Sequence, residues 1–238
     1  MIEKNYTSMQ VIDKGLFYEI YWTFLIPFLC FFGTLANIIS IVCLRKIQAN
    51  GHMFKFMMSN SAINAGYMFL CGFIFLLRCG SLCKTNTSKL ELIIYNFIIW
   101  DYLTSSMAIL INFNEMIMCI QRYSLIRNWK RFQFKRFNLI FPFLIIMSII
   151  VYLPRLFFRA IRKKENDNNE FELIDTSFKT STFGIVLDIL VSIIRGPICL
   201  LIILTINIFT GIEFAKLIKK KKMLKLGNSK PGIFLINF

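Results

Sequence analysis

The sequence predicts an all-α fold, a polytopic membrane helix bundle with five transmembrane helices. Apolar residues make up 56% of the 238-residue chain and charged residues only 17%, which is far from the usual soluble mix. Five apolar stretches are long enough to cross a hydrocarbon core of about 30 Å as helices. None shows the two-residue alternation of a membrane β-barrel, and only a helix satisfies its own backbone in lipid.

The first helix, 22–44, is predicted to be a signal anchor. It is too long for the core of a cleaved signal peptide, and acidic Glu3, Asp13 and Glu19 precede it without a basic start. The other predicted helices cover residues 56–77, 93–120, 139–158 and 182–212. These boundaries divide the chain into an extracellular amino-terminal segment, 1–21, a helical membrane domain, 22–222, and a short cytosolic tail, 223–238.

Lysine and arginine are more frequent on one side of the predicted bundle than on the other. Sixteen of them fall in the segments 45–55, 122–136 and 216–238, and eleven fall on the opposite side. Because cytosolic loops carry the excess of these residues, we predict an outside amino terminus and a cytosolic carboxyl terminus in a multi-pass plasma-membrane protein. The N-glycosylation triplets that begin at Asn5 and Asn86 both lie on the predicted outer side.

The composition also argues against several classes of function. The formal net charge of +15 belongs to a mostly apolar chain, so we expect its cations to meet anionic lipid or acidic partners rather than nucleic acid. The single histidine, His52, and the scattered cysteines form no metal-binding motif. We therefore expect no metal, no cofactor, no catalytic residue and no enzyme. Cys79 and Cys83 lie near the predicted outer surface, and whether they pair stays open.

Polar residues recur along one face of the third predicted helix. Their intervals of four and three residues place them on the same side of a helix. They are Asp101, Ser105, Ala108, Asn112, Glu115, Cys119 and Arg122. The fifth predicted helix repeats the pattern with Asp188, Ser192, Arg195 and Cys199. Both faces are expected to point into the bundle, because a charge at the bilayer centre costs about 3 kcal/mol.

Two roles stay open for the outer members of these faces, which are Asp101, Ser105, Asp188, Ser192 and Arg195. They either hold helices together or face a ligand. We predict that Asp101 and Asp188 lie in the outer half of the interior, with Arg195 near an acid of the third helix. Asp101 and Glu115 are 14 residues apart, about 21 Å along a helix, which is too far for a catalytic carboxylate pair.

The inner end of the third predicted helix carries a recognisable tripeptide. Gln121-Arg122-Tyr123 is followed by an apolar residue, Ile126, three positions later. This pattern resembles the Asp/Glu-Arg-Tyr motif that ends the third helix of the rhodopsin-like (class A) G-protein-coupled receptors, with the acid replaced by glutamine. A tripeptide alone carries little weight, but its position and orientation here match those of the family.

Other residues fit the same resemblance. Gly33 and Asn37 are similar to the glycine and asparagine of the family's first helix, and Asn64 stands where its second helix usually has an acid. Pro154 and Pro197 fall at the family's usual places in the fourth and fifth helices. The family's outer cysteine pair and its fourth-helix tryptophan are absent. The pattern looks most like divergent invertebrate receptors of the orphan or chemosensory type.

The resemblance implies a receptor that binds an unknown extracellular ligand and signals to a heterotrimeric G protein. Arg122 would then be the inner switch, with Gln121, Tyr123 and Ile126 beside it. The intramembrane polar core would consist of Asn37, Asn64, Asn112 and Glu115.

The resemblance covers residues 20 to about 222, the first five helices of a seven-helix receptor fold. We therefore expect an incomplete receptor, truncated after the fifth helix, which could form a receptor dimer with a full-length partner. Two alternatives stay open. One is a five-span subunit of a channel or transporter, and the other is a membrane accessory protein without a ligand of its own.

Overall fold

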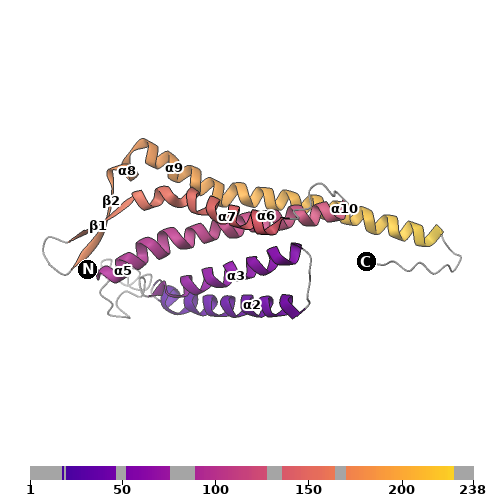
Figure 1. Ribbon diagram of the computed structural model, residues 1–238, viewed down its shortest axis with the longest axis horizontal. Helices are drawn as coiled ribbons and strands as arrows, with labels where there is room; N and C mark the ends of the chain where they lie inside the picture. The colour runs from indigo at the N-terminus through magenta and orange to yellow at the C-terminus, as the bar shows by residue number, and fades with distance from the viewer. Residues whose placement is uncertain are drawn as a thin grey trace, which may run out of the picture.

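The computed structural model is a bundle of long helices with a small two-stranded hairpin at one end (Figure 1). It describes residues 18, 20–46, 52–75, 89–127, 136–163 and 170–227. The first long helix joins a π-helical turn, η1 (Tyr21–Leu25), to α2 (Ile26–Lys46), and α3 (His52–Gly72) follows it. The third long helix of the bundle is continuous over 37 residues. It comprises α5 (Leu90–Ile94), the π-helical η3 (Tyr95–Thr104) and α6 (Ser105–Ile126).

The second half of the chain contains two more long helices. The first is α7 (Phe137–Tyr152), which ends in a 3₁₀ turn, η5 (Leu153–Phe157). Strands β1 (Arg159–Lys163) and β2 (Phe171–Asp175) and the single turn α8 (Ser177–Thr180) come next. The last helix comprises α9 (Thr182–Ile193), the π-helical η6 (Ile194–Ile198) and α10 (Cys199–Gly227).

Four helices of the described chain are long and apolar enough to cross a membrane. They are Tyr21–Lys46, Leu90–Ile126, Phe137–Phe157 and Thr182–Lys221. They confirm the predicted helices at 22–44, 93–120, 139–158 and 182–212 as membrane-spanning candidates. The remaining predicted span, 56–77, which is the second in chain order, coincides largely with α3, which is helical but less apolar. Polar Ser59, Asn60, Ser61 and Asn64 lower its hydropathy, so its crossing of the membrane stays a prediction.

The third long helix lies at the centre of the bundle, because α6 packs against α3, α7 and α10. Half of its apolar stretch is buried, against 6% of the corresponding stretch of the first helix. The main apolar core joins α3, α6 and α7 through Phe56, Ile63, Leu110, Ile117, Met118 and Leu144. A smaller cluster of Ile109, Tyr152 and Val191 lies nearer the hairpin and joins α6 to α7 and α9.

Large apolar side chains cover the outside of the bundle. Phe31 on α2 and Leu200 on α10 are 65% and 67% exposed, and most of their apolar neighbours on these helices are also exposed. Water would disfavour such a surface, whereas lipid tails match it. These helices therefore belong to a multi-span protein of the lipid bilayer.

One short hairpin accompanies the helices of the predicted all-α fold. Between the fourth and fifth predicted helices, where no helix was predicted, β1 and β2 pair antiparallel, with Arg159 opposite Asp175 and Lys163 opposite Phe171. The Thr176 hydroxyl donates to the Phe157 carbonyl at 2.6 Å and closes the base of the hairpin. The missed signal was the pair of short runs RAIRK and FELID, separated by a polar, turn-forming stretch rich in Asn and Asp.

Candidate functional site

Arginines from the hairpin end of the bundle neutralise both acids that we predicted for its outer interior. Arg159, the first residue of β1, donates from Nη1 to Asp101 Oδ2 at 2.6 Å, and it also lies 3.8 Å from Asp175. Arg155 donates from Nη2 to Asp188 Oδ1 at 2.9 Å, and so links η5 to α9. Each acid therefore holds two segments of the chain together.

Arg195 does not meet an acid of the third helix, contrary to our prediction. Its Nη1 lies 3.4 Å from the Tyr152 hydroxyl, to which it donates, and no ion pair of the described chain includes it. The reason is that Arg155 and Arg159, which lie at the hairpin end, pair with the two acids instead. The third and fifth helices are nevertheless joined, because Asn112 Nδ2 donates to the Arg195 carbonyl at 2.7 Å.

Two serines of the predicted faces differ in their surroundings. Ser105 is buried at the start of α6, as expected for a residue of the bundle interior. Ser192 on α9 is exposed instead. The polar face of the fifth helix is therefore interrupted between Asp188 and Arg195.

Acidification is expected to loosen the hairpin. Lys179 Nζ donates to Asp175 Oδ2 at 2.7 Å, and this bond, with Arg159 nearby, lowers the pKa of the Asp175 carboxyl from its ordinary value of 3.8. A carboxyl with a lowered pKa stabilises the folded form above its ordinary pKa, and this contribution is lost as the pH falls through the lowered pKa. Amide hydrogen exchange of β1 and β2, corrected for intrinsic rates, should therefore accelerate as the pH falls below about 4.

The variant Asp175→Asn, which cannot titrate, should weaken this pH dependence, whereas Glu172→Gln on the same strand should keep it in full. Equal pH dependence in Asp175→Asn and the unmodified chain would contradict the assignment.

A hydrogen bond between two asparagine amides, one buried and one partly buried, joins α3 to α6 and was not predicted from the sequence. Asn114 is fully buried, and its Nδ2 donates to Asn60 Oδ1 and to the Phe56 carbonyl, both at 3.1 Å. Asn114 Oδ1 is buried without a hydrogen-bond partner among the described residues. The sequence indicates such a contact only by an asparagine inside each of two apolar helices. Asn114 does not belong to the predicted polar face of the third helix, so its role was not predicted.

The two predicted core asparagines of the first helices have less distinctive positions. Asn37 is partly buried and donates from Nδ2 to the Gly33 carbonyl of its own helix at 2.8 Å. Asn64 is also partly buried, on α3. In the described part of the chain, α3 and α6 are joined near these positions by the hydrogen bond from the Asn114 amide to the Asn60 amide.

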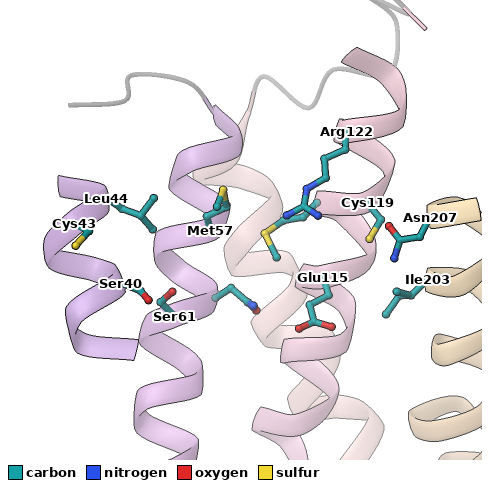
Figure 2. Close-up of a pocket in the computed structure, with 12 residues that line it drawn as sticks. Ser40, Cys43, Leu44, Met57, Ser61, Glu115, Cys119, Arg122, Ile203 and Asn207 are labelled. Atoms are coloured by element: carbon teal, nitrogen blue, oxygen red, sulfur yellow. The ribbon is translucent and has the colours of Figure 1, made fainter. Parts of the chain in front are cut away.

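A cavity of about 540 Å³ lies between α2, α3, α6 and α10, toward the end of the bundle away from the hairpin (Figure 2). The residues that line it are Ser40, Cys43, Leu44, Met57, Asn60, Ser61, Glu115, Met118, Cys119, Arg122, Ile203 and Asn207. Its size is typical of ligand-binding and partner-binding pockets, and its lining combines apolar side chains with several polar groups.

Glu115 and Arg122 bring opposite charges to this cavity from the same face of α6 (Figure 2). They are seven residues apart, two helical turns, and so are separated by about 10 Å along the axis. Glu115 is partly buried and Arg122 is exposed, and neither forms an ion pair with a residue that the structure describes. Both charges are therefore available to a group that enters the cavity.

The neighbours of Arg122 point elsewhere. Gln121 is buried, and its Oε1 has no hydrogen-bond partner in the described part of the chain. The Tyr123 hydroxyl accepts a hydrogen bond from Arg127 Nη1 at 2.9 Å. Ile126, partly buried, is the last residue of α6. Of the predicted switch residues, Arg122 is therefore the one that lines the cavity.

Several predicted residues lie outside the described residues. These are the glycosylation triplets at Asn5 and Asn86, and the cysteines Cys79 and Cys83. Their assignments stay predictions.

No protein-family model matches the chain, and no curated protein is significantly similar to it. The class that the fold itself defines is a multi-span helical membrane protein. Within this class, the cavity that contains Glu115 and Arg122 and the ion-paired hairpin end are the two candidate functional regions.

Proposed function

We propose that the chain is a rhodopsin-like G-protein-coupled receptor, which binds an extracellular ligand at the hairpin end and a heterotrimeric G protein at the opposite end. The observation that carries the proposal is the position of Arg122. It ends the polar face of the central helix, lines a cavity of about 540 Å³, and keeps its guanidinium free of acidic partners among the described residues. A guanidinium so placed can donate to the carbonyls or the carboxylate of an entering protein segment.

The central helix connects the two ends of this proposed receptor. It is continuous over 37 residues from Leu90 to Ile126, which is about 55 Å. Its outer part is held by Asp101 through Arg159, and Asn112 joins it to the last helix beside Arg195. A ligand that favours one arrangement of these contacts would shift the population of bundle packings, and with it access to Arg122.

The proposed orientation places the amino terminus outside the plasma membrane and the cavity in the cytosol. The excess of lysine and arginine on the side of the cavity supports it. We assign no catalytic role to any residue.

The proposal is tested by the binding of a G protein to the whole chain in nanodiscs. The chain should retain heterotrimers that have been freed of nucleotide by apyrase, and GTPγS should release them. Empty nanodiscs and nanodiscs with an unrelated multi-span protein serve as controls. If no class of heterotrimer is retained above these controls, or if GTPγS does not release it, the receptor proposal fails.

The position of Glu115 favours a second candidate function, a channel or transporter subunit. Glu115 is 11 residues from the end of α6, about 16 Å, which is near the middle of a bilayer of ordinary thickness. Intramembrane carboxylates often mark ion pathways. Liposomes that contain the chain should then show a cation flux, which Glu115→Gln removes. The receptor proposal predicts no such flux.

A further inference from the structure

The cavity between α2, α3, α6 and α10 carries opposite charges at two levels (Figure 2). Glu115 lies at the deeper level, and Arg122 lies nearer the end of α6. Neither side chain forms an ion pair or a hydrogen bond with a residue that the structure describes. An intramembrane carboxylate without a partner is unfavourable. The cavity therefore calls for an occupant that supplies a partner to each charge.

The lining between the two charged levels is apolar. Met118 lies one turn from each of them on α6, and its side chain is 8% exposed. Met57 of α3 lines the same cavity. Figure 2 shows Ser61 near the level of Glu115 and Met57 nearer to Arg122. An occupant that suits this lining has two charged ends and an apolar middle.

The difference in height between Glu115 and Arg122 limits the length of the occupant. Seven residues rise about 10 Å along α6, and both side chains lean toward the same end of the helix. After one charge-assisted hydrogen bond of about 2.8 Å at each end, about 5 Å remains between the charged groups of the occupant. Three methylene groups between an amine nitrogen and a carboxyl carbon span about this length. The cavity volume of about 540 Å³ is typical of small-molecule sites.

We infer that this cavity binds a small zwitterion, an ω-amino acid whose ammonium group donates to the Glu115 carboxylate and whose carboxylate accepts from the Arg122 guanidinium. A simple cation would leave Arg122 unpaired, and a simple anion would leave Glu115 unpaired. Met57 and Met118 would enclose the methylene chain. The inference rests on the cavity and its two charges and not on receptor activity, so the loss of G-protein retention would leave it standing.

The probe is tritiated 4-aminobutyrate, added to the whole chain in dodecyl maltoside micelles, whose headgroups carry no charge. We expect saturable binding with a dissociation constant below about 1 mM. Butyrate and butylamine each lack one of the two charged groups, so they should compete about tenfold more weakly or worse. This comparison uses the unmodified chain and does not depend on how any variant folds.

Two variants test the assignment of the two ends. Glu115→Gln and Arg122→Gln each remove one charge, and each should weaken the binding of 4-aminobutyrate about tenfold or more. The controls Glu213→Gln and Arg127→Gln remove charges of the same signs from residues that do not line the cavity. Both controls should leave the dissociation constant within about twofold of the original.

Three results would overturn the inference. The first is the absence of saturable binding. The second is binding of butyrate or butylamine as tight as that of 4-aminobutyrate, or equal affinity in the original chain and the variants Glu115→Gln and Arg122→Gln. The third concerns lipid, because the phosphatidylcholine headgroup is also a zwitterion. If 4-aminobutyrate binds in micelles but not in phosphatidylcholine nanodiscs, the occupant is a headgroup, whereas equal binding in both supports a soluble zwitterion.

Discussion

Replacing Asp188 with leucine while Arg155 is kept should destabilise the folded chain by about 3 kcal/mol. The reason is the arginine that is left behind. Arg155 and Asp188 are joined at 2.9 Å, and their side chains are only 29% and 43% exposed. Most large apolar side chains of the neighbouring α9 and α7 are exposed, so in a bilayer lipid would surround the remaining charge and screen it less than water does. Arg155 also lies 5.4 Å from the Tyr152 ring, a contact too weak to replace a carboxylate in such surroundings.

The matched control is the double variant Arg155→Leu with Asp188→Leu, which removes both charges. It should recover most of the lost stability, because two leucines suit an apolar environment better than one unpaired guanidinium. The cycle consists of the unmodified chain, Asp188→Leu, Arg155→Leu and the double variant. Unfolding by SDS in mixed micelles measures the stability of each. If the double variant is as unstable as the sum of the single variants, the two residues do not act as a pair.

Replacing Arg122 with alanine should weaken the retention of nucleotide-free G protein about tenfold or more. Arg122 is exposed and forms no ion pair in the described part of the chain, so the change should leave SDS unfolding unaltered. The measurement is the dissociation constant of the apyrase-treated heterotrimer from nanodiscs.

Arg122→Lys, which keeps the charge but loses the planar donor geometry, should recover part of the affinity. Arg127→Ala removes a neighbouring cation outside the cavity and serves as the second control. Unchanged affinity in Arg122→Ala would exclude this residue as the contact for the G protein, even if the chain binds one.

The positions of the membrane-spanning helices were largely predictable from the sequence. Apolar length is a local property, and the four confirmed candidates begin and end within about three residues of the predicted ones, except that the third continues to Ile126 and the last to Lys221. α3 was harder to judge, because Ser59, Asn60, Ser61 and Asn64 lie close together within one apolar run. The period of the polar residues also placed Glu115 and Arg122 correctly on one face of the third helix.

The partners of the charged residues could not be predicted in the same way. Periodicity tells which side of a helix a residue is on, but not which neighbouring helix stands opposite or at what height. Arg155 and Arg159 therefore displaced Arg195 as partners of the two acids. The link between Asn60 and Asn114 was missed for the same reason, since an amide inside an apolar helix gives no indication of its distant partner.

The π-helical η3, Tyr95–Thr104, also affects how the third helix can change during evolution. A π turn is in effect an α-helix with one additional residue inserted. Deletion of a single residue there would restore the α-helical hydrogen bonds, but it would rotate Leu90–Ile94 by about 100° relative to α6. Tyr95, whose hydroxyl donates to the Leu70 carbonyl at 2.8 Å, would leave its contact with α3. The number of residues in this segment therefore sets the rotational phase of Leu90–Ile94 relative to α6, whereas substitutions of its side chains leave that phase unchanged.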